Sequence, residues 1–236
     1  MTASRTAVVT GASRGIGLAV AQSLAPRGWR VAMVARGGAA LSDAAHAIGG
    51  NALPLRCDVR DRTALRELTD RVLETFGGAP DVLVNSAGVF AIAPMRTIEP
   101  ETFEQAIDAN LVAPFRLIRA FLPAMLERGS GHVVSIGSIA DHVALPGNGA
   151  YAASKFGLRG LHEVLRAELV GTGVRSTLVS PGPVDTTMWD DVDPDRRPGF
   201  TPRARMLRPD AVAAAVLFAI EQPADVNVGE MRLARS

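Results

Sequence analysis

Short apolar runs alternate with longer helical patterns along the whole chain. The short runs, rich in Val, Ala and Leu, predict strands at 6–10, 30–35, 52–57, 81–86, 132–137, 174–180 and 228–234. Between them, apolar residues recur at helical spacing near 15–27, 39–48, 61–76, 100–127, 150–171 and 209–221. Strands that are apolar on both faces and joined by helices predict a parallel sheet covered on both sides. Right-handed crossovers make it an α/β, doubly wound, Rossmann-type sheet of about seven strands.

One segment departs from this alternation. Residues 186–207, "TTMWDDVDPDRRPGFTPRARML", carry prolines, a tryptophan and mixed charge without a clear period. A long connection inside a compact domain is usually a functional lid or a disordered link. We therefore expect one domain over residues 1–236 with a substrate loop at 186–207. A solvated surface loop without a role is the alternative.

Composition and charge narrow the class of protein. The chain has 236 residues, 47% of them hydrophobic, which is ample material for a large core. Its 25 basic and 24 acidic residues are interspersed, so a nucleic-acid partner is not indicated. The N-terminus lacks the features of a secretory signal, and the apolar run at 211–220 is about half the length of a membrane span. With a single cysteine, Cys57, these features predict a soluble, cytoplasmic protein without a membrane partner.

A rare pair of residues carries the first chemical signal. Tyr151 is the only tyrosine, and Lys155 is the only lysine among 25 Lys and Arg residues. A phenol can give up a proton and an ammonium group can be tuned, which phenylalanine and arginine cannot copy. On a helix, positions i and i+4 share a face. We interpret the pair as functional, although chance in a biased composition is the alternative.

A glycine-rich turn supplies the second signal. "TGASRGIG", residues 10–17, follows the first predicted strand and runs into a helix, with glycines at 11, 15 and 17. Such glycines let the backbone turn tightly and approach a ligand, while the helix N-terminus behind them attracts phosphate. A plain glycine turn is the alternative.

Taken together, these motifs resemble the short-chain dehydrogenase/reductase family. T-G-x-x-x-G-x-G after the first strand, "NSAG" at 85–88, a serine at 138 and Y-x-x-x-K occur in the family's order across nearly the whole chain. One stretch departs slightly, because Ser135 and Gly137 stand where the family more often has Asn and Ser. The resemblance implies this catalytic set: Asn110, Ser138, Tyr151 and Lys155.

The resemblance also implies a role for each catalytic residue. Tyr151 would be the general acid for carbonyl reduction, and the charge of Lys155 would favour its phenolate. Lys155 would also bond the nicotinamide ribose, Ser138 would hold the substrate oxygen, and Asn110 would anchor a water at a helix irregularity. The implied cofactor contacts are Gly11, Ser13, Arg14, Gly15, Ile16, Gly17, Arg36, Asp58, Val59, Asn85, Ala87, Gly88, Tyr151, Lys155, Pro181, Gly182, Val184 and Thr186. Asp58 could equally be a helix cap.

The cofactor choice depends on the end of the second strand. An NAD enzyme of this fold places an acid about 20 residues beyond the glycine turn, whereas an arginine accommodates the phosphate of NADP. Here Arg36 occupies that place, the next acid is Asp43, and Arg14 adds a second basic residue in the turn. We predict NADP(H), although either arginine could be a solvated surface charge.

We therefore expect an NADP-dependent oxidoreductase that acts on a carbonyl or secondary alcohol. The alternative is a catalytically silent NADP-binding sensor on the same fold, and a purely structural protein leaves the motifs unexplained. The long helices at 100–127 and 150–171 carry apolar residues around much of their circumference, which predicts a homo-oligomer, a tetramer or a dimer. The four histidines lack metal-ligand spacing, so we predict no metal site. An apolar substrate pocket is expected from Phe90, Val143, Leu145, Met188 and Trp189.

Overall fold

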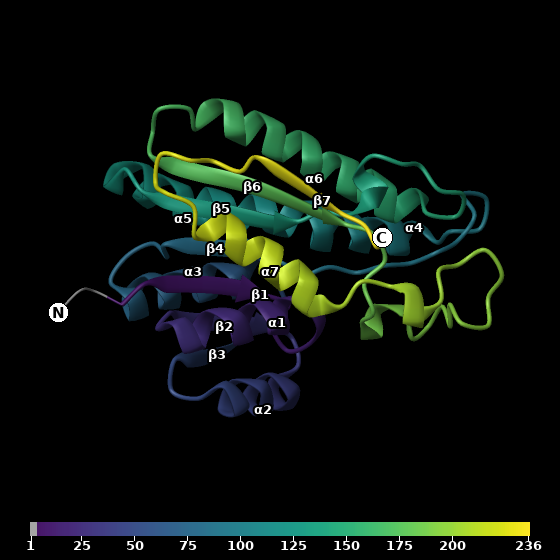
Figure 1. Ribbon diagram of the computed structural model, residues 1–236, viewed down its shortest axis with the longest axis horizontal. Coiled ribbons are helices and arrows are strands. Elements are labelled where there is room, and N and C mark those ends of the chain that lie inside the picture. The colour runs from purple at the N-terminus through teal and green to yellow at the C-terminus, as the bar shows by residue number, and fades with distance from the viewer. Residues whose placement is uncertain (1–3) are drawn as a thin grey trace.

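The predicted doubly wound parallel sheet is confirmed. A computed structural model describes residues 4–236 and shows one sheet in the order β3-β2-β1-β4-β5-β6-β7, with every pairing parallel (Figure 1). Helices cover both faces of this sheet. The strands are β1 (Thr6–Thr10), β2 (Arg30–Ala35), β3 (Ala52–Arg56), β4 (Val82–Asn85), β5 (Gly131–Ile136), β6 (Val174–Pro181) and β7 (Glu230–Leu233).

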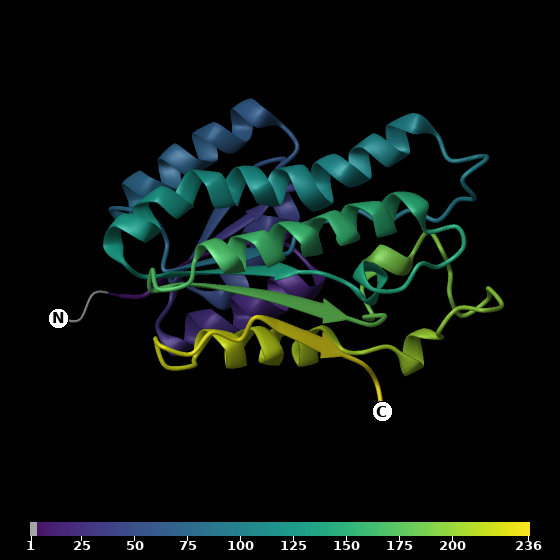
Figure 2. The same ribbon diagram turned by 90° about the horizontal axis from the view of Figure 1, so that it is seen from above.

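The strands are apolar on both faces because two separate cores use them. Val8 and Val9 are adjacent in β1 and both fully buried, yet they belong to different clusters. Successive side chains of a strand point to opposite faces, so each cluster lies on its own side of the sheet. The helices α1, α2 and α7 cover one side, and α3, α5 and α6 cover the other (Figure 2).

The helices match their predicted ranges, with local differences that have clear causes. The predicted helix 15–27 ends at Leu24 and continues as a 3₁₀ turn containing Pro26, which cannot extend the α-helical hydrogen bonds. The predicted helix 150–171 ends at Glu168, before Gly171 with φ +77°. The helices are α1 (Gly15–Leu24), α2 (Gly38–Ile48), α3 (Arg62–Phe76), α4 (Pro100–Ile107), α5 (Ala113–Arg128), α6 (Gly149–Glu168) and α7 (Pro209–Ile220).

The longest helical stretch, Pro100–Arg128, is interrupted by a π-helical turn at Asp108–Val112. By length and mean hydropathy alone this stretch could cross a bilayer. Its buried side chains, including Leu117 and Phe121, instead belong to the core beneath the sheet. Its apolar character is therefore that of a core helix.

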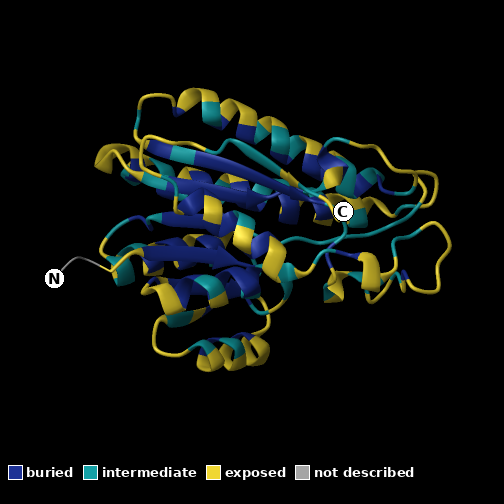
Figure 3. Cartoon of the chain, viewed as in Figure 1, coloured by how far each residue is buried: buried dark blue, intermediate teal, exposed yellow. Residues whose placement is uncertain are grey.

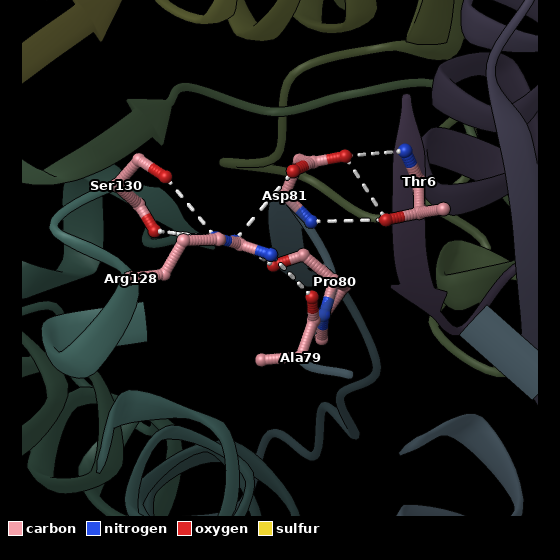
Figure 4. A network of polar contacts seen from close by, with 6 residues as sticks. All are labelled: Thr6, Ala79, Pro80, Asp81, Arg128 and Ser130. Atoms are coloured by element: carbon pink, nitrogen blue, oxygen red, sulfur yellow. Dashed lines mark hydrogen bonds and ion pairs between the residues drawn. The ribbon is translucent and has the colours of Figure 1, made fainter. Parts of the chain in front are cut away.

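A polar network fixes the amino ends of three strands (Figure 4). Asp81, just before β4, accepts hydrogen bonds from the N–H group (2.7 Å) and hydroxyl (3.0 Å) of Thr6 in β1. Arg128, at the end of α5, donates to the carbonyls of Ala79 (2.8 Å) and of Ser130 before β5 (3.1 Å). This network holds the end of the sheet opposite to the predicted site.

Residues 186–207 form a connection between β6 and α7 with two short 3₁₀ turns, Thr187–Trp189 and Arg203–Arg205. The segment lies beyond the carboxyl ends of the strands, where Figure 3 shows it largely exposed.

Candidate active site

The predicted site residues gather where the strands end. Because the strands are parallel, the carboxyl ends of β1, β4, β5 and β6 meet at one edge of the sheet. The strand order reverses between β1 and β4, which is where ligands of doubly wound sheets bind. The glycine turn 10–17, the segment 85–88, Ser138 and the segment 181–186 each follow one of these strand ends.

Close backbone packing explains the glycines of the first turn. Gly11 and Gly15 have φ values of +68° and +57°, which residues with side chains rarely adopt. A Cβ atom on Gly17 would lie 2.5 Å from the carbonyl oxygen of Gly11. α1 begins directly behind the turn, and its first turn carries only neutral residues. Within the described chain its N–H groups lack a side-chain cap, so turn and helix together offer a place for an anion.

Thr10 joins the glycine turn to the loop after β4. Its hydroxyl oxygen accepts hydrogen bonds from the backbone N–H groups of Ser86 and Ala87, both at 3.0 Å. In the same loop Asn85 donates to the Ser135 hydroxyl (3.3 Å), whereas its buried Oδ1 has no partner among the described residues. Sequence reasoning assigned Thr10 no role, although it heads the glycine motif.

Tyr151 and Lys155 lie one turn apart on α6, as their spacing predicts. The Lys155 ammonium donates a hydrogen bond to the carbonyl of Ile136 at the end of β5 (2.8 Å) and lies 5.5 Å from the centre of the Tyr151 ring. Ser138 follows two residues after Ile136 and begins the 3₁₀ turn Ile139–Asp141. The structure thus brings three of the four predicted catalytic residues together.

Burial works against the charged forms of this pair. It raises the pKa of Tyr151 to about 12, while the Ser138 hydroxyl lowers this pKa and the charge of Asp141 raises it. Burial also lowers the pKa of Lys155 to about 8, and here the charge of Asp141 acts in the opposite sense. Both shifts follow from removing a charge from water.

Asn110, the fourth predicted catalytic residue, lies in the π-helical turn and is almost fully buried. Its amide accepts a hydrogen bond from the N–H group of Val89 (2.9 Å) and donates to the Val89 carbonyl (3.0 Å) and the Ser154 hydroxyl (3.0 Å). A Cβ atom on Gly88 would lie 3.0 Å from its Oδ1. The Asn110 side chain therefore ties the loop after β4 to α6, and its role toward a water stays a prediction.

The residues expected at the adenine end lie near the carboxyl ends of β1 to β3. Arg14 and Arg36 are exposed, Ser13 and Ile16 are half-buried in the glycine turn, and Val59 is buried. Arg14 follows the end of β1 and Arg36 the end of β2, and β2 ends without an acidic residue.

Asp58 does not cap a helix. Its carboxylate accepts two side-chain hydrogen bonds from Arg60 (3.1 and 2.8 Å), and these lower the pKa of Asp58. The cap of α3 is Asp61, which accepts from the N–H groups of Thr63 and Ala64. The helix-cap alternative for Asp58 is therefore wrong, because the cap position lies three residues later, at Asp61.

The turn after β6 reaches back to the glycine turn. Pro181 ends β6, and the N–H group of Gly182 donates to the Leu233 carbonyl (2.8 Å). Val184 is buried, and Thr186 lies so close to Gly15 that a Cβ atom there would be 3.2 Å from its Cγ2. The segment 181–186 and the glycine turn thus border the same space.

An arginine secures the segment 186–207 at its base. Arg203 donates to the carboxylates of Asp185 (2.9 Å) and Asp190 (2.5 Å) and to the carbonyl of Thr186 (3.0 Å). Trp189 donates from its indole nitrogen to the Val184 carbonyl (3.0 Å). Sequence reasoning missed Arg203, because nothing in its local pattern shows that acids 13 and 18 residues earlier are its partners.

A row of aromatic rings leads from Tyr151 into this segment. The ring centre of Phe90 lies 4.8 Å from that of Tyr151 and 5.0 Å from that of Trp189, with edge-to-face geometry. Trp189 continues the row to Phe200, at 6.4 Å. Val143, Leu145 and Met188 are exposed apolar side chains. Of the residues expected to border a substrate, Phe90 thus lies next to the phenol ring, and Trp189 lies next to Phe90.

Cys57, His132 and His162 are buried side chains. Burial raises the pKa of Cys57 to about 11, so its thiol stays protonated. His132 and His162 are buried and contact the hydroxyls of Thr177 (2.7 Å) and Ser176 (2.9 Å), and burial lowers their pKa values to about 3 and about 4. Across residues 4–236 no three His, Cys, Asp or Glu side chains cluster as metal ligands.

Comparison with known proteins agrees with this geometry. The family model of short chain dehydrogenases matches residues 5–197. D-threitol dehydrogenase of Mycolicibacterium smegmatis is 38% identical over 221 residues, covering 91% of this chain and 85% of that protein. The closed form of serine dehydrogenase complexed with NADP⁺ superimposes with a TM-score of 0.88 at 30% identity, covering 96% and 93% of the two chains. A metagenomic short-chain oxidoreductase in complex with NADP gives a TM-score of 0.84 at 34% identity, covering 98% and 97%. The chain belongs to the short-chain dehydrogenase/reductase family of oxidoreductases.

Proposed function

We propose that the protein transfers a hydride between NADP(H) and a carbonyl or secondary alcohol, with Tyr151 as the general acid and base. The observation that carries this proposal is the meeting of Tyr151, Lys155 and Ser138 at the carboxyl edge of the sheet. During reduction the phenol gives its proton to the substrate oxygen. The nearby ammonium of Lys155 stabilises the phenolate that remains, and Ser138 holds the oxygen.

The residues present fit the cofactor. The glycine turn and the uncapped start of α1 suit a pyrophosphate, because they offer backbone N–H groups without side chains in the way. The buried Oδ1 of Asn85, which lacks a partner in the described chain, would accept a hydrogen bond at the same edge. When bound, the nicotinamide supplies or accepts the hydride. The remaining contacts are proposed for Pro181, Gly182, Val184 and Thr186, beside the glycine turn.

Two exposed arginines support NADP(H) over NAD(H). Guanidinium groups bind phosphate in bidentate fashion, and Arg14 and Arg36 are both exposed. The end of β2 carries no carboxylate that would repel a phosphate. Both solved structures compared above contain NADP.

The aromatic row supports an apolar substrate. The Phe90 ring lies next to the phenol and the Trp189 ring next to Phe90, and we propose that the segment 186–207 acts as a lid on this side. Rings in this position exclude water and stack on flat, apolar groups. We propose an apolar ketone or its alcohol as the substrate class.

Turnover tests the proposal. Purified protein is mixed with NADPH and a panel of aliphatic and aryl ketones, and NADPH consumption is followed. Tyr151→Phe should bind NADPH nearly as before while its turnover falls by about 100- to 10,000-fold, as is typical for lost acid–base catalysis. Near-normal turnover in this variant would contradict the role of the phenol, and cofactor binding without turnover on every ketone would favour the silent sensor.

We further propose that the protein works as a homo-oligomer in the cytoplasm. Phe115 on α5 and Phe156 and Val164 on α6 are exposed apolar side chains on the outer face of this helix layer. Covering them with a second copy would remove apolar surface from water.

A further inference from the structure

A buried carboxylate lies directly behind the candidate catalytic serine. Asp141 ends the short turn that Ser138 begins, and its side chain has no exposed surface. A Cβ atom on Gly137 would lie 2.5 Å from the Asp141 Oδ2 and 2.5 Å from the Ser180 Oγ. The glycine where the family more often has serine therefore makes room for this carboxylate.

Three donors surround the Asp141 carboxylate. Its Oδ2 accepts hydrogen bonds from the Ser138 N–H group (3.2 Å) and from the Ser180 hydroxyl (2.5 Å), and its Oδ1 contacts the Nδ1 of His142. The His142 Nε2 lies 2.9 Å from the Glu230 carboxylate, close enough for an ion pair but outside hydrogen-bond geometry. The carboxylate is thus hydrogen-bonded although it is buried, as buried polar groups of folded proteins usually are.

The charge of Asp141 reaches the candidate catalytic pair. It favours the ammonium form of Lys155 and disfavours the phenolate form of Tyr151. For Lys155 the charge of Asp141 opposes the effect of burial, and for Tyr151 it adds to the effect of burial. Near neutral pH both directions favour a charged lysine and a protonated tyrosine. The titratable groups that act on or contact this carboxylate are Tyr151 and Lys155 on α6 and the adjacent His142. Beyond His142 lies Glu230 on β7, with Arg232 and Arg159 near it.

We propose that Asp141 is the buried counter-charge of the active site, a positioning residue that fixes the Ser138 turn from behind through its hydrogen bonds to the Ser138 N–H group and the Ser180 hydroxyl. This inference rests on the proposed function and deepens it, since a protonated phenol is the form that donates to a carbonyl oxygen. The centre is thereby set for reduction at neutral pH. The serine hydroxyl is held at the same time, because the carboxylate anchors the backbone N–H group of Ser138.

The composition of the chain offers a direct test. Lys155 is the only lysine and Tyr151 the only tyrosine, so each gives one signal. The full-length protein is titrated by isotope-edited NMR of the Lys155 ε-methylene and by phenolate absorbance, without substrate. Asp141→Asn keeps the shape and removes the charge, and Asp141→Ser is a second neutral variant. Asp225→Asn, an exposed acid in the loop before β7, is the matched control.

In Asp141→Asn we expect the Lys155 titration to move to lower pH and the phenolate to form at lower pH, with no movement in Asp225→Asn. In the pH profile, ketone reduction should then decline at lower pH than in the unmodified protein. Unchanged titrations in a folded neutral variant would overturn the proposal, as would failure of both neutral variants to fold, which would make Asp141 structural. Because the titrations need no turnover, their failure is separate from a failure on the ketone panel.

Discussion

The buried ammonium of Lys155 should lower the free energy of unfolding of the protein. A variant without this charge should therefore be more stable. The proposed change is Lys155→Met, which keeps an unbranched chain of similar length and removes the charge. Methionine fits buried gaps of this kind because its side chain is flexible and apolar.

The magnitude follows from the position of Lys155. Burial lowers the pKa of Lys155 from 10.5 to about 8. This difference, at about 1.4 kcal/mol per pH unit, makes the charged form roughly 3 kcal/mol less favourable in the folded than in the unfolded protein. The variant also loses the 2.8 Å hydrogen bond to Ile136, worth about 1 kcal/mol. We therefore expect a net gain of about 2 kcal/mol at neutral pH, while turnover is lost.

The pH dependence has a definite sign. Between pH 8 and 10.5 the unfolded chain binds the lysine proton and the folded chain does not, so the unfolding free energy of the unmodified protein rises with pH across this window. The penalty is complete below the folded pKa of about 8 and disappears above 10.5. The advantage of Lys155→Met should therefore shrink as the pH rises.

Thermal unfolding of the cofactor-free protein measures the effect. For a domain of this size about 2 kcal/mol corresponds to a rise in Tm of roughly 4–8 °C. Lys155→Arg, which keeps a charge that cannot be neutralised, is the control and should be neither stabilised nor active. A Lys155→Met variant that melts below the unmodified protein at neutral pH would refute the reasoning.

Three further outcomes are expected. Arg36→Asp should raise the Michaelis constant for NADPH far more than for NADH, because it replaces a phosphate-binding guanidinium by a carboxylate; steady-state kinetics with equal effects on both cofactors would contradict this. Light scattering should give the mass of a symmetric oligomer, and Phe156→Glu should dissociate it, whereas a monomer at micromolar concentration would count against the proposal. Trp189→Ala should weaken binding of aryl ketones more than of small aliphatic ketones, with equal losses in competition assays arguing against stacking.

The sequence by itself determined the sheet and most of its helices, because their signals are local. Val8 and Val9 in β1 are both apolar, and only a strand covered on two sides explains such a run. The glycines at 11, 15 and 17 and the spacing of Tyr151 and Lys155 likewise depend on backbone geometry within a few residues. The alternation of these signals was sufficient to predict the parallel topology that the structure confirms.

Only the tertiary structure decided which distant groups meet. Asp141 lies fully buried between Ser138 and Ser180, 39 residues later in the chain, and the sequence pattern around it gave no sign of that burial. Arg203 likewise contacts Asp185 and Asp190, and the loop that brings these residues together has no regular sequence period. A side chain's partners across the fold depend on how strands and helices pack, and packing is set by contacts that no short window of sequence contains. The hydrogen bonds and charges around the candidate site are of that long-range kind, which is why the sequence could predict the candidate residues and only the fold could show their partners.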